Sequence, residues 1–432
     1  MFFDTIPKAL YIHIPFCKKK CSYCDFFSIP DSEDSFISAV LEETINQIKY
    51  FKKLLNISAL KTIYIGGGTP SVIGAEKLGK FIETVLSMYS NTGSEAYPEA
   101  LSKEASLFPK AIRDSEHSLV IARGEASKQS RTRMLYDKPP NLPGEFSIEI
   151  NPETVTPSLL EMLNKLPVTR ISIGVQSFNK KMVDTLGRNC TVESVYNALR
   201  LIKKYSNKKI SIDLISSIPG QTVSEALSDV TTAVSFKPAH ISLYYLTLEE
   251  GTKLYQMFTD KDQDERCWIE ACKLLESSGY DHYEISNFCL PGQECVHNMN
   301  YWKIEPYIGC GLSAVSTFYN EGSFYRASVT DNPEIFLQGE KSLWGMETEV
   351  ISKNDFLIEL LMMGLRTKEG VNLQEIDNFF NIDIEKVLEP VISKWDKNGF
   401  ITMESHNLAL NNKGRYFHTS FMLDIMNLQS IL

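Results

Sequence analysis

Short apolar runs rich in β-branched residues recur between residues 9 and 246, and amphipathic segments separate them. Six runs have the length and composition of buried strands: Ala9–Ile14, Thr62–Ile65, Phe146–Ile150, Arg170–Val175, Ile210–Ile215 and His240–Leu246. Four segments between them have the apolar spacing of helices: Ser35–Leu55, Ser158–Leu166, Val192–Lys204 and Val223–Ser235. Nearly continuous apolar strands that alternate with helices predict an α/β fold, with a parallel sheet covered by helices. This pattern favours an open barrel of six βα units, with a doubly wound sheet as the alternative.

Residues 350–432 have a different pattern. Helical periodicity over Phe356–Leu365, Leu373–Phe379 and Ile384–Asn398 precedes two short runs, Gly399–Met403 and Asn407–Leu410, that predict a hairpin. Helices followed by a hairpin are typical of a winged helix, so we expect a separate small helical domain. Because such a fold alone does not establish DNA binding, we interpret this domain as a cap over the barrel mouth.

Residues 91–144 interrupt the alternation of strands and helices within the first domain, residues 1–330. The segment is rich in Ser, Glu, Lys and Arg, and Pro139-Pro140 and Pro143-Gly144 stand near its end. A short connection would be usual between a helix and the next strand. We therefore predict a flexible surface insertion here.

Charge and cysteine content narrow the class of protein. The net charge of −10 argues against a nucleic-acid-binding surface, which is normally basic. The sequence has neither an apolar run long enough to span a bilayer nor a signal-peptide pattern. Nine cysteines without such a signal indicate a reducing compartment, so we expect a cytoplasmic protein, with peripheral membrane contact left open.

Three cysteines on one short loop carry the strongest chemical signal. Cys17, Cys21 and Cys24 follow the first predicted strand in a Cys-x3-Cys-x2-Cys pattern. A structural zinc site needs four ligands, usually in paired Cys-x2-Cys units, and one such pair is present here. A [4Fe–4S] cluster normally takes one thiolate for each of its four irons. Three thiolates would therefore leave one iron open to a small molecule.

Polar motifs also follow the ends of the next four predicted strands. They are Gly66-Gly67-Gly68-Thr69-Pro70, Asn151-Pro152-Glu153, Gln176-Ser177-Phe178 and Pro219-Gly220. Glycines allow a backbone to approach a ligand closely. Barrel enzymes place their chemistry at the C-terminal ends of the strands, so the motif positions and the predicted fold support one another.

The cysteine motif and the downstream triple glycine resemble the signature of the radical S-adenosylmethionine (SAM) family. The resemblance implies a partial (βα)6 barrel and a [4Fe–4S] cluster held by Cys17, Cys21 and Cys24. It also implies that the open iron chelates the amino and carboxylate groups of SAM. In that family an electron from the reduced cluster cleaves SAM, so the resemblance also implies an electron donor as a partner.

Four further motifs are similar to those of the coproporphyrinogen III dehydrogenase-like subfamily: Ser147-Ile148-Glu149, Ile173–Phe178, Leu186-Gly187-Arg188 and Ile212–Ile215. By that resemblance Tyr11 lies beside the sulfonium, and Gly66, Gly67, Gly68 and Thr69 hold the amino group of SAM. Glu149 and Arg188 would contact the methionine part, and Gln176 and Asp213 the ribose hydroxyls. These residue types suit those contacts, because carboxylates and amides accept hydrogen bonds from hydroxyl and ammonium groups.

Two groups within this subfamily differ just beyond Cys24. The dehydrogenases, which oxidatively decarboxylate coproporphyrinogen III to protoporphyrinogen IX, have a further cysteine two positions later. The related HemW-type heme chaperones carry Cys-Asp-Phe, which matches Cys24-Asp25-Phe26. The absence of that cysteine favours the chaperones, and the dehydrogenase remains the enzymatic alternative.

The segment His297-Asn298-x2-Tyr301-Trp302 resembles a proposed heme-contact motif of the same chaperones. Heme iron accepts imidazole or thiolate as an axial ligand. The resemblance therefore implies heme as a cofactor, with His297 as its ligand and Cys295 as the alternative, and heme-accepting apoproteins such as respiratory cytochromes as partners. In the other interpretation, His297 and Asn298 hydrogen-bond a loop while the two aromatic residues fill a core.

Overall fold

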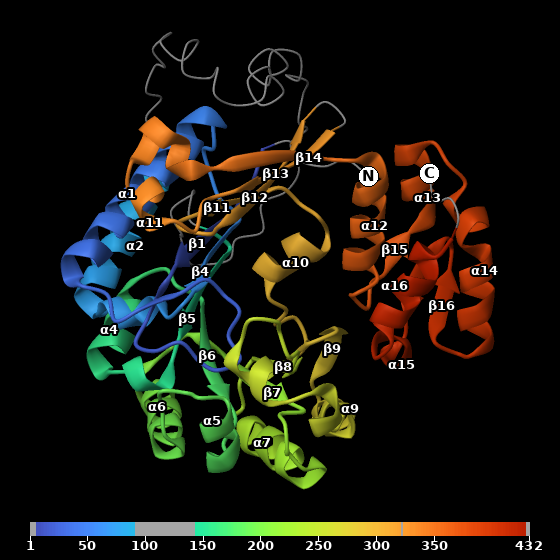
Figure 1. Cartoon of the computed structure of the whole chain (residues 1–432), viewed down its shortest axis with the longest axis horizontal. Coiled ribbons are helices and arrows are strands. Elements are labelled where there is room, and N and C mark those ends of the chain that lie inside the picture. The colour runs from blue at the N-terminus through green and yellow to red at the C-terminus, as the bar shows by residue number, and fades with distance from the viewer. Residues whose placement is uncertain (1–5, 91–142, 321–322, 429–432) are drawn as a thin grey trace, which may run out of the picture.

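The computed structural model describes residues 6–90, 143–320 and 323–428. Of the predicted insertion at 91–144, residues 91–142 lie outside the described part of the chain. In the described part of the chain, the strands form a curved sheet and a layer of helices lies outside it (Figure 1). A smaller unit lies beside this sheet.

Six parallel strands form the centre of a twelve-stranded sheet. In spatial order they are β1 (Ala9–Ile14), β4 (Thr62–Gly67), β5 (Glu145–Ile150), β6 (Arg170–Gln176), β7 (Lys209–Ser216) and β8 (His240–Tyr245). Their apolar side chains, such as Ile12, Ile65 and Ile173, are fully buried, as expected for strands covered on both faces. The predicted strands therefore agree with the observed ones to within two residues at each end.

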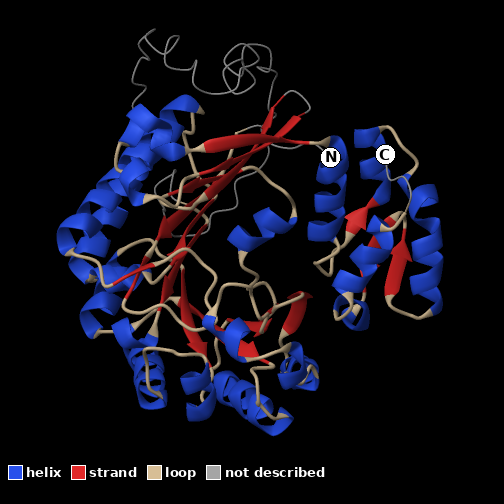
Figure 2. Cartoon of the chain, viewed as in Figure 1, coloured by secondary structure: helices blue, strands red, loops and turns tan. Residues whose placement is uncertain are grey.

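Helices cover the outer face of this sheet (Figure 2). They are α1 (Asp34–Leu54), α2 (Ala75–Ser90), α4 (Pro157–Lys165), α5 (Lys180–Thr185), α6 (Val192–Tyr205), α7 (Val223–Ser235) and α9 (Arg266–Ser277). Thr191 and Thr222 begin α6 and α7 with capping boxes, in which each threonine side chain accepts from the backbone N–H three residues on. These local signals are why the two helices begin where the sequence predicts.

The sheet continues past the barrel on both sides. Beside β1 lie β11 (Tyr307–Cys310), β12 (Val315–Asn320), β13 (Ser323–Ser328) and β14 (Glu347–Ile351), and beside β8 lie β10 (Asn287–Cys289) and β9 (Asp281–Glu284). Strand β11 runs parallel to β1, and the other added strands are antiparallel to their neighbours. Within the described residues the sheet is open, with β14 and β9 as its two edges, so the predicted partial (βα)6 barrel is confirmed.

Short elements complete the first unit. They are the parallel pair β2 (Phe16–Cys17) and β3 (Ile29–Pro30), the helices α8 (Lys253–Met257), α10 (Val296–Trp302) and α11 (Pro333–Phe336), and several 3-10 turns.

The C-terminal unit contains the predicted helices and hairpin. Its elements are α12 (Lys353–Gly364), β15 (Val371–Asn372), α13 (Leu373–Phe380), α14 (Ile384–Lys397), β16 (Ile401–Glu404), β17 (Asn407–Leu410), α15 (Asn412–Arg415) and α16 (His418–Met426). Buried side chains such as Leu361, Ile376 and Phe421 give it a core largely of its own. Arg366 Nε pairs with Glu284 Oε2 of β9 at 2.9 Å, which attaches the unit to the edge of the sheet.

No helix within the described ranges is both long enough and apolar enough to cross a membrane.

Candidate functional site

A cavity of about 540 Å³ opens at the C-terminal ends of the parallel strands, within the range of about 300–1,000 Å³ usual for small-molecule sites. Ten of the residues predicted from the sequence line it: Cys17, Cys21, Cys24, Gly67, Gly68, Thr69, Glu149, Gln176, Arg188 and Asp213. Three predicted residues, Tyr11, Gly66 and His297, are not among its lining residues. No lining residue comes from the C-terminal unit among the described residues, and a role of this unit as a cap over the mouth stays a prediction.

Cys17 ends β2, and Cys21 and Cys24 lie on the following loop, which two backbone contacts hold in place. Ser22 N donates to Leu186 O at 2.9 Å, and Ser22 O accepts from Leu254 N at 3.0 Å. Gly187 has a φ of +66°, and a Cβ there would lie 2.2 Å from Ser22 Oγ. Position 187 therefore requires glycine, both for its backbone conformation and for the close approach of Ser22 on the cysteine loop.

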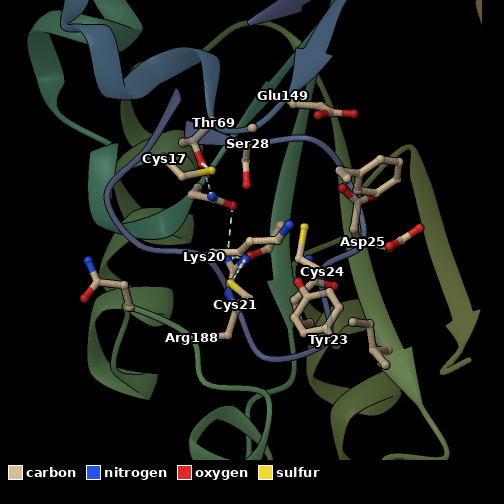
Figure 3. Close-up of a pocket in the computed structure, with 18 of the residues that line it drawn as sticks. Cys17, Lys20, Cys21, Tyr23, Cys24, Asp25, Ser28, Thr69, Glu149 and Arg188 are labelled. Atoms are coloured by element: carbon tan, nitrogen blue, oxygen red, sulfur yellow. Dashed lines mark hydrogen bonds between the residues drawn. The ribbon is translucent and has the colours of Figure 1, made fainter. Parts of the chain in front are cut away.

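The three cysteine side chains line the cavity (Figure 3). Cys17 Sγ lies 3.6 Å from Thr69 Oγ1, and Cys21 Sγ accepts from Arg188 Nη1 at 3.9 Å. All three are free thiols and are partly exposed. Burial raises the pKa of Cys24 to about 11, so the free thiol is protonated at neutral pH, and coordination to a metal would remove that proton.

A single metal ion is not the group that this loop fits. In the described part of the chain, no three His, Cys, Asp or Glu side chains are arranged around one ion position. A [4Fe–4S] cluster binds each thiolate to a different iron, so its cysteines need to line one cavity rather than converge on one point. Cys17, Cys21 and Cys24 meet that requirement.

Glu149 forms one wall of the cavity at the end of β5. Its Oε1 accepts from the Tyr64 hydroxyl at 2.8 Å, and its Oε2 accepts from Gly67 N at 3.2 Å. Gly66 lies directly beneath this carboxylate, because a Cβ on Gly66 would be 2.9 Å from Glu149 Cδ. Burial raises the pKa of Glu149 to about 7, although the hydrogen bond from Tyr64 opposes the shift. The carboxylate is thus fixed in position and titrates near neutral pH.

Two acceptors on the neighbouring strands, Asp213 and Gln176, also line the cavity. Asp213 on β7 accepts from Ser172 Oγ at 3.1 and 2.9 Å, and burial raises its pKa to about 6. Gln176 ends β6 with a φ of +67°, and its buried Oε1 has no hydrogen-bond partner among the described residues. A buried amide oxygen without a partner is costly, so a ligand hydroxyl would satisfy it. These acceptors therefore fit a ligand with amino and hydroxyl groups.

Asn151 belongs to one of the predicted polar motifs, but no role in the site was predicted for it from the sequence. Its Nδ2 donates to Thr69 Oγ1 at 2.6 Å, and its Oδ1 accepts from Arg188 Nη2 at 3.0 Å. It thereby joins the glycine-rich loop to the arginine beside Cys21. The signal was present in the sequence, because Asn151 directly follows a predicted strand at the edge where the other motifs lie.

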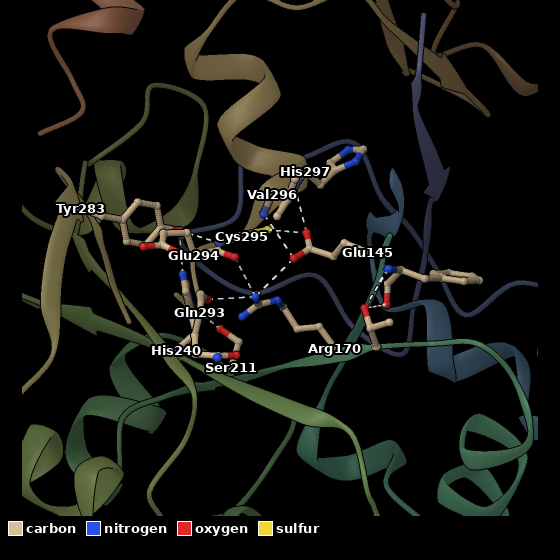
Figure 4. A network of polar contacts seen from close by, with 12 residues as sticks. Glu145, Arg170, Ser211, His240, Tyr283, Gln293, Glu294, Cys295, Val296 and His297 are labelled. Atoms are coloured by element: carbon tan, nitrogen blue, oxygen red, sulfur yellow. Dashed lines mark hydrogen bonds and ion pairs between the residues drawn. The ribbon is translucent and has the colours of Figure 1, made fainter. Parts of the chain in front are cut away.

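His297 lies at the other end of the barrel, on α10. Figure 4 shows the start of this helix held by Glu145, whose carboxylate accepts from His297 N at 2.9 Å and from Val296 N at 3.2 Å. Arg170 Nη2 lies 3.3 Å from Glu145 Oε2 and donates at 2.9 Å to each of two carbonyls, those of Gln293 and Glu294. Glu145 and Arg170 begin β5 and β6, so this network lies at the N-terminal ends of the strands.

Both ring nitrogens of His297 are engaged. Nδ1 lies 2.8 Å from Thr62 Oγ1, and Nε2 lies 2.8 Å from the Tyr301 hydroxyl. Burial lowers the pKa of His297 to about 3, so the ring is neutral. Cys295, the alternative ligand, is buried, and its Sγ lies 3.5 Å from Glu145 Oε1. Ligation of heme iron by His297, which stays a prediction, would therefore require the loss of one of these hydrogen bonds.

Comparison with known proteins identifies the family. The model of the Radical SAM superfamily matches residues 11–233, more than half of the chain. The chain belongs to the radical SAM superfamily. Membership implies a [4Fe–4S] cluster and SAM, and the cavity described above holds the thiols and acceptors that would bind them. A bound cluster would supply an electron for the cleavage of SAM, and the residues that line the cavity would hold and orient the two groups. A second model, of the HemN C-terminal domain, matches residues 351–417.

Relatives of this radical SAM protein match it along nearly its whole length. The "Heme chaperone HemW" of Lactococcus lactis subsp. lactis (strain IL1403) is 29% identical, with 98% of this chain and 99% of the relative covered. The protein of the same name from Escherichia coli (strain K12) is 28% identical over 96% of this chain and 97% of the relative. Coproporphyrinogen III oxidase (HemN) from Escherichia coli, a radical SAM enzyme of known structure, has a TM-score of 0.72 at 16% identity over 98% of this chain and 90% of that one. The structural likeness shows that the fold is shared.

Proposed function

We propose that this radical SAM protein is a heme chaperone, which binds heme and a SAM-liganded [4Fe–4S] cluster and delivers the heme to apoproteins. The observation that carries the proposal is the match, over nearly the full length of both chains, to relatives named heme chaperones. Respiratory cytochromes are the proposed recipients, a separate electron donor would reduce the cluster, and the proposed compartment is the cytoplasm.

Phe26 supports this proposal over the enzymatic alternative. Its side chain is 70% exposed and lines the cavity, at the position where the dehydrogenases carry a further cysteine. A phenyl ring cannot bind iron or exchange protons. At this position the chain therefore lacks the thiol of the further cysteine that the dehydrogenases carry.

The proposed roles of the cavity residues follow from their positions. Cys17, Cys21 and Cys24 would hold the cluster, and Glu149 and Arg188 would contact the methionine part of SAM. Asp213 and Gln176 would accept from the ribose hydroxyls, with the Gly67–Thr69 turn against the amino group. Tyr11 would influence SAM without lining the cavity, because its hydroxyl lies 3.0 Å from His13 Nδ1.

One sample tests the proposed function against the alternative. The cluster is reconstituted anaerobically, heme is titrated into one half, and the other half receives coproporphyrinogen III, SAM and a reductant. We expect stoichiometric heme binding and no decarboxylated product, because Phe26 replaces the further cysteine. An authentic coproporphyrinogen dehydrogenase assayed in parallel controls for the activity conditions. Decarboxylation of coproporphyrinogen over repeated turnovers would contradict the chaperone proposal.

A further inference from the structure

A column of polar side chains, three of them aromatic, runs through the barrel interior from the cavity to α10. It consists of Glu149, Tyr64, His297 and Tyr301, which we call the interior column. The Tyr64 hydroxyl donates to Glu149 Oε1 at 2.8 Å, and the Tyr64 ring stacks on the His297 ring with centroids 5.2 Å apart. The His297 ring in turn meets Tyr301 edge-on, also at 5.2 Å, and shares a hydrogen bond with its hydroxyl. The column thus connects the Glu149 carboxylate in the cavity to His297 and Tyr301 on α10, at the N-terminal ends of the barrel strands.

Each member of the interior column is fixed by the next. Tyr64 has one hydroxyl proton, and that proton is donated to Glu149. Its ring packs against His297, which cannot turn without losing the hydrogen bond to Thr62 Oγ1 or to Tyr301. The helix that carries His297 is itself anchored by the buried Glu145 carboxylate. A displacement of α10 would therefore reach Glu149 through two contacts.

We propose that Tyr64 and His297 are positioning residues of the SAM site. Tyr64 holds the Glu149 carboxylate in the orientation that receives the amino-acid part of SAM, and His297 holds Tyr64. The inference rests on the proposed contact between Glu149 and SAM. It gives the His297 segment a role in the SAM site, separate from the predicted ligation of heme iron.

The first test is Tyr64→Phe in the reconstituted, cluster-loaded protein. The change keeps the ring and removes only the donor to Glu149, so the Kd for SAM should rise about tenfold, the effect of losing one hydrogen bond to a charged group. Tyr280→Phe is the matched control, because the buried Tyr280 hydroxyl donates to Pro238 O at 2.8 Å and makes no contact with Glu149. Equal iron content in the two variants shows that the cluster is intact.

The pH dependence of SAM binding separates positioning from general damage. Glu149 must be ionised to accept from the amino group of SAM, and burial raises its pKa to about 7, so affinity should fall as the pH drops through about 7. The Tyr64 hydroxyl lowers that pKa, so Tyr64→Phe should move the midpoint to higher pH, whereas Tyr280→Phe should not. The other groups that interact electrostatically with this carboxylate are unchanged in both variants. They are the Gly67 amide on β4, Asp213 on β7, Tyr11 on β1, Tyr244 on β8 and Tyr301 on α10.

His297→Gln completes the test, with SAM and heme titrated into the same preparation. We expect weaker SAM binding, whether or not heme affinity changes. Loss of heme binding with SAM affinity intact would overturn the assignment of His297 and make its ring an iron ligand. A Tyr64→Phe variant with a SAM Kd within about twofold of the unaltered protein, or no weaker than Tyr280→Phe, would overturn the assignment of Tyr64. Failure of the unaltered, cluster-loaded protein to bind SAM would instead remove the premise that this cavity is a SAM site.

Discussion

Replacement of Cys17, Cys21 or Cys24 by alanine, one at a time, is expected to abolish cluster binding. Each thiolate of a three-thiolate cluster holds a different iron, so the loss of any one leaves two irons without a protein ligand. Because the three thiols lie on one loop around one cavity, none can substitute for another. The measurement is the visible absorbance and the iron and sulfide content after anaerobic reconstitution.

Cys190→Ala is the control for this series. Cys190 is also a free, partly exposed cysteine, but it does not line the cavity. Its replacement should leave the iron content unchanged. Full iron content in any of the three loop variants would refute ligation by these three thiolates.

Arg170→Met is expected to destabilise the fold by about 3–5 kcal/mol, the usual cost of breaking a buried ion pair from one side. The side chains of Arg170 and Glu145 are 3% and 8% exposed, so methionine would leave the carboxylate charged and buried without its partner. The carbonyls of Gln293 and Glu294 would also lose their shared donor. The free energy of unfolding, from denaturant titration, measures the effect.

Two variants make this second prediction specific. Lys180→Ala removes one partner of an exposed pair in which Lys180 Nζ lies 2.6 Å from Asp184 Oδ2, and its stability should hardly change. The double variant Arg170→Met/Glu145→Met replaces both buried charges with apolar groups and should recover part of the lost stability. An Arg170→Met variant as stable as Lys180→Ala would show that the network does not anchor α10.

The six barrel strands could be predicted because their physical signal is local. A strand buried on both faces must be largely apolar, and the buried Ile171, Ile173 and Val175 show that property without reference to the rest of the chain. The cavity could be predicted for a related reason. Parallel strands bring their C-terminal ends together, so polar motifs that follow successive strands meet once the topology is known.

The network beneath the barrel could not be predicted, because its partners are distant in sequence. Arg170 looks like the polar start of a strand, yet its guanidinium binds carbonyls 123 and 124 residues away. His297 was interpreted from a local motif, which gives no information on burial or on the Thr62 hydroxyl 235 residues away. The position of the C-terminal unit likewise depends on long-range pairs such as Arg366 with Glu284.

Transfer of heme is the measurement that tests the central claim most directly. The anaerobically reconstituted protein is loaded with one heme per chain, freed of excess heme and mixed with the heme-free form of a respiratory b-type cytochrome, and the cytochrome spectrum is followed. We predict that the holocytochrome forms faster from the loaded chaperone than from free heme at the same concentration. Heme that stays on the loaded protein, or transfer no faster than from free heme, would contradict a chaperone function.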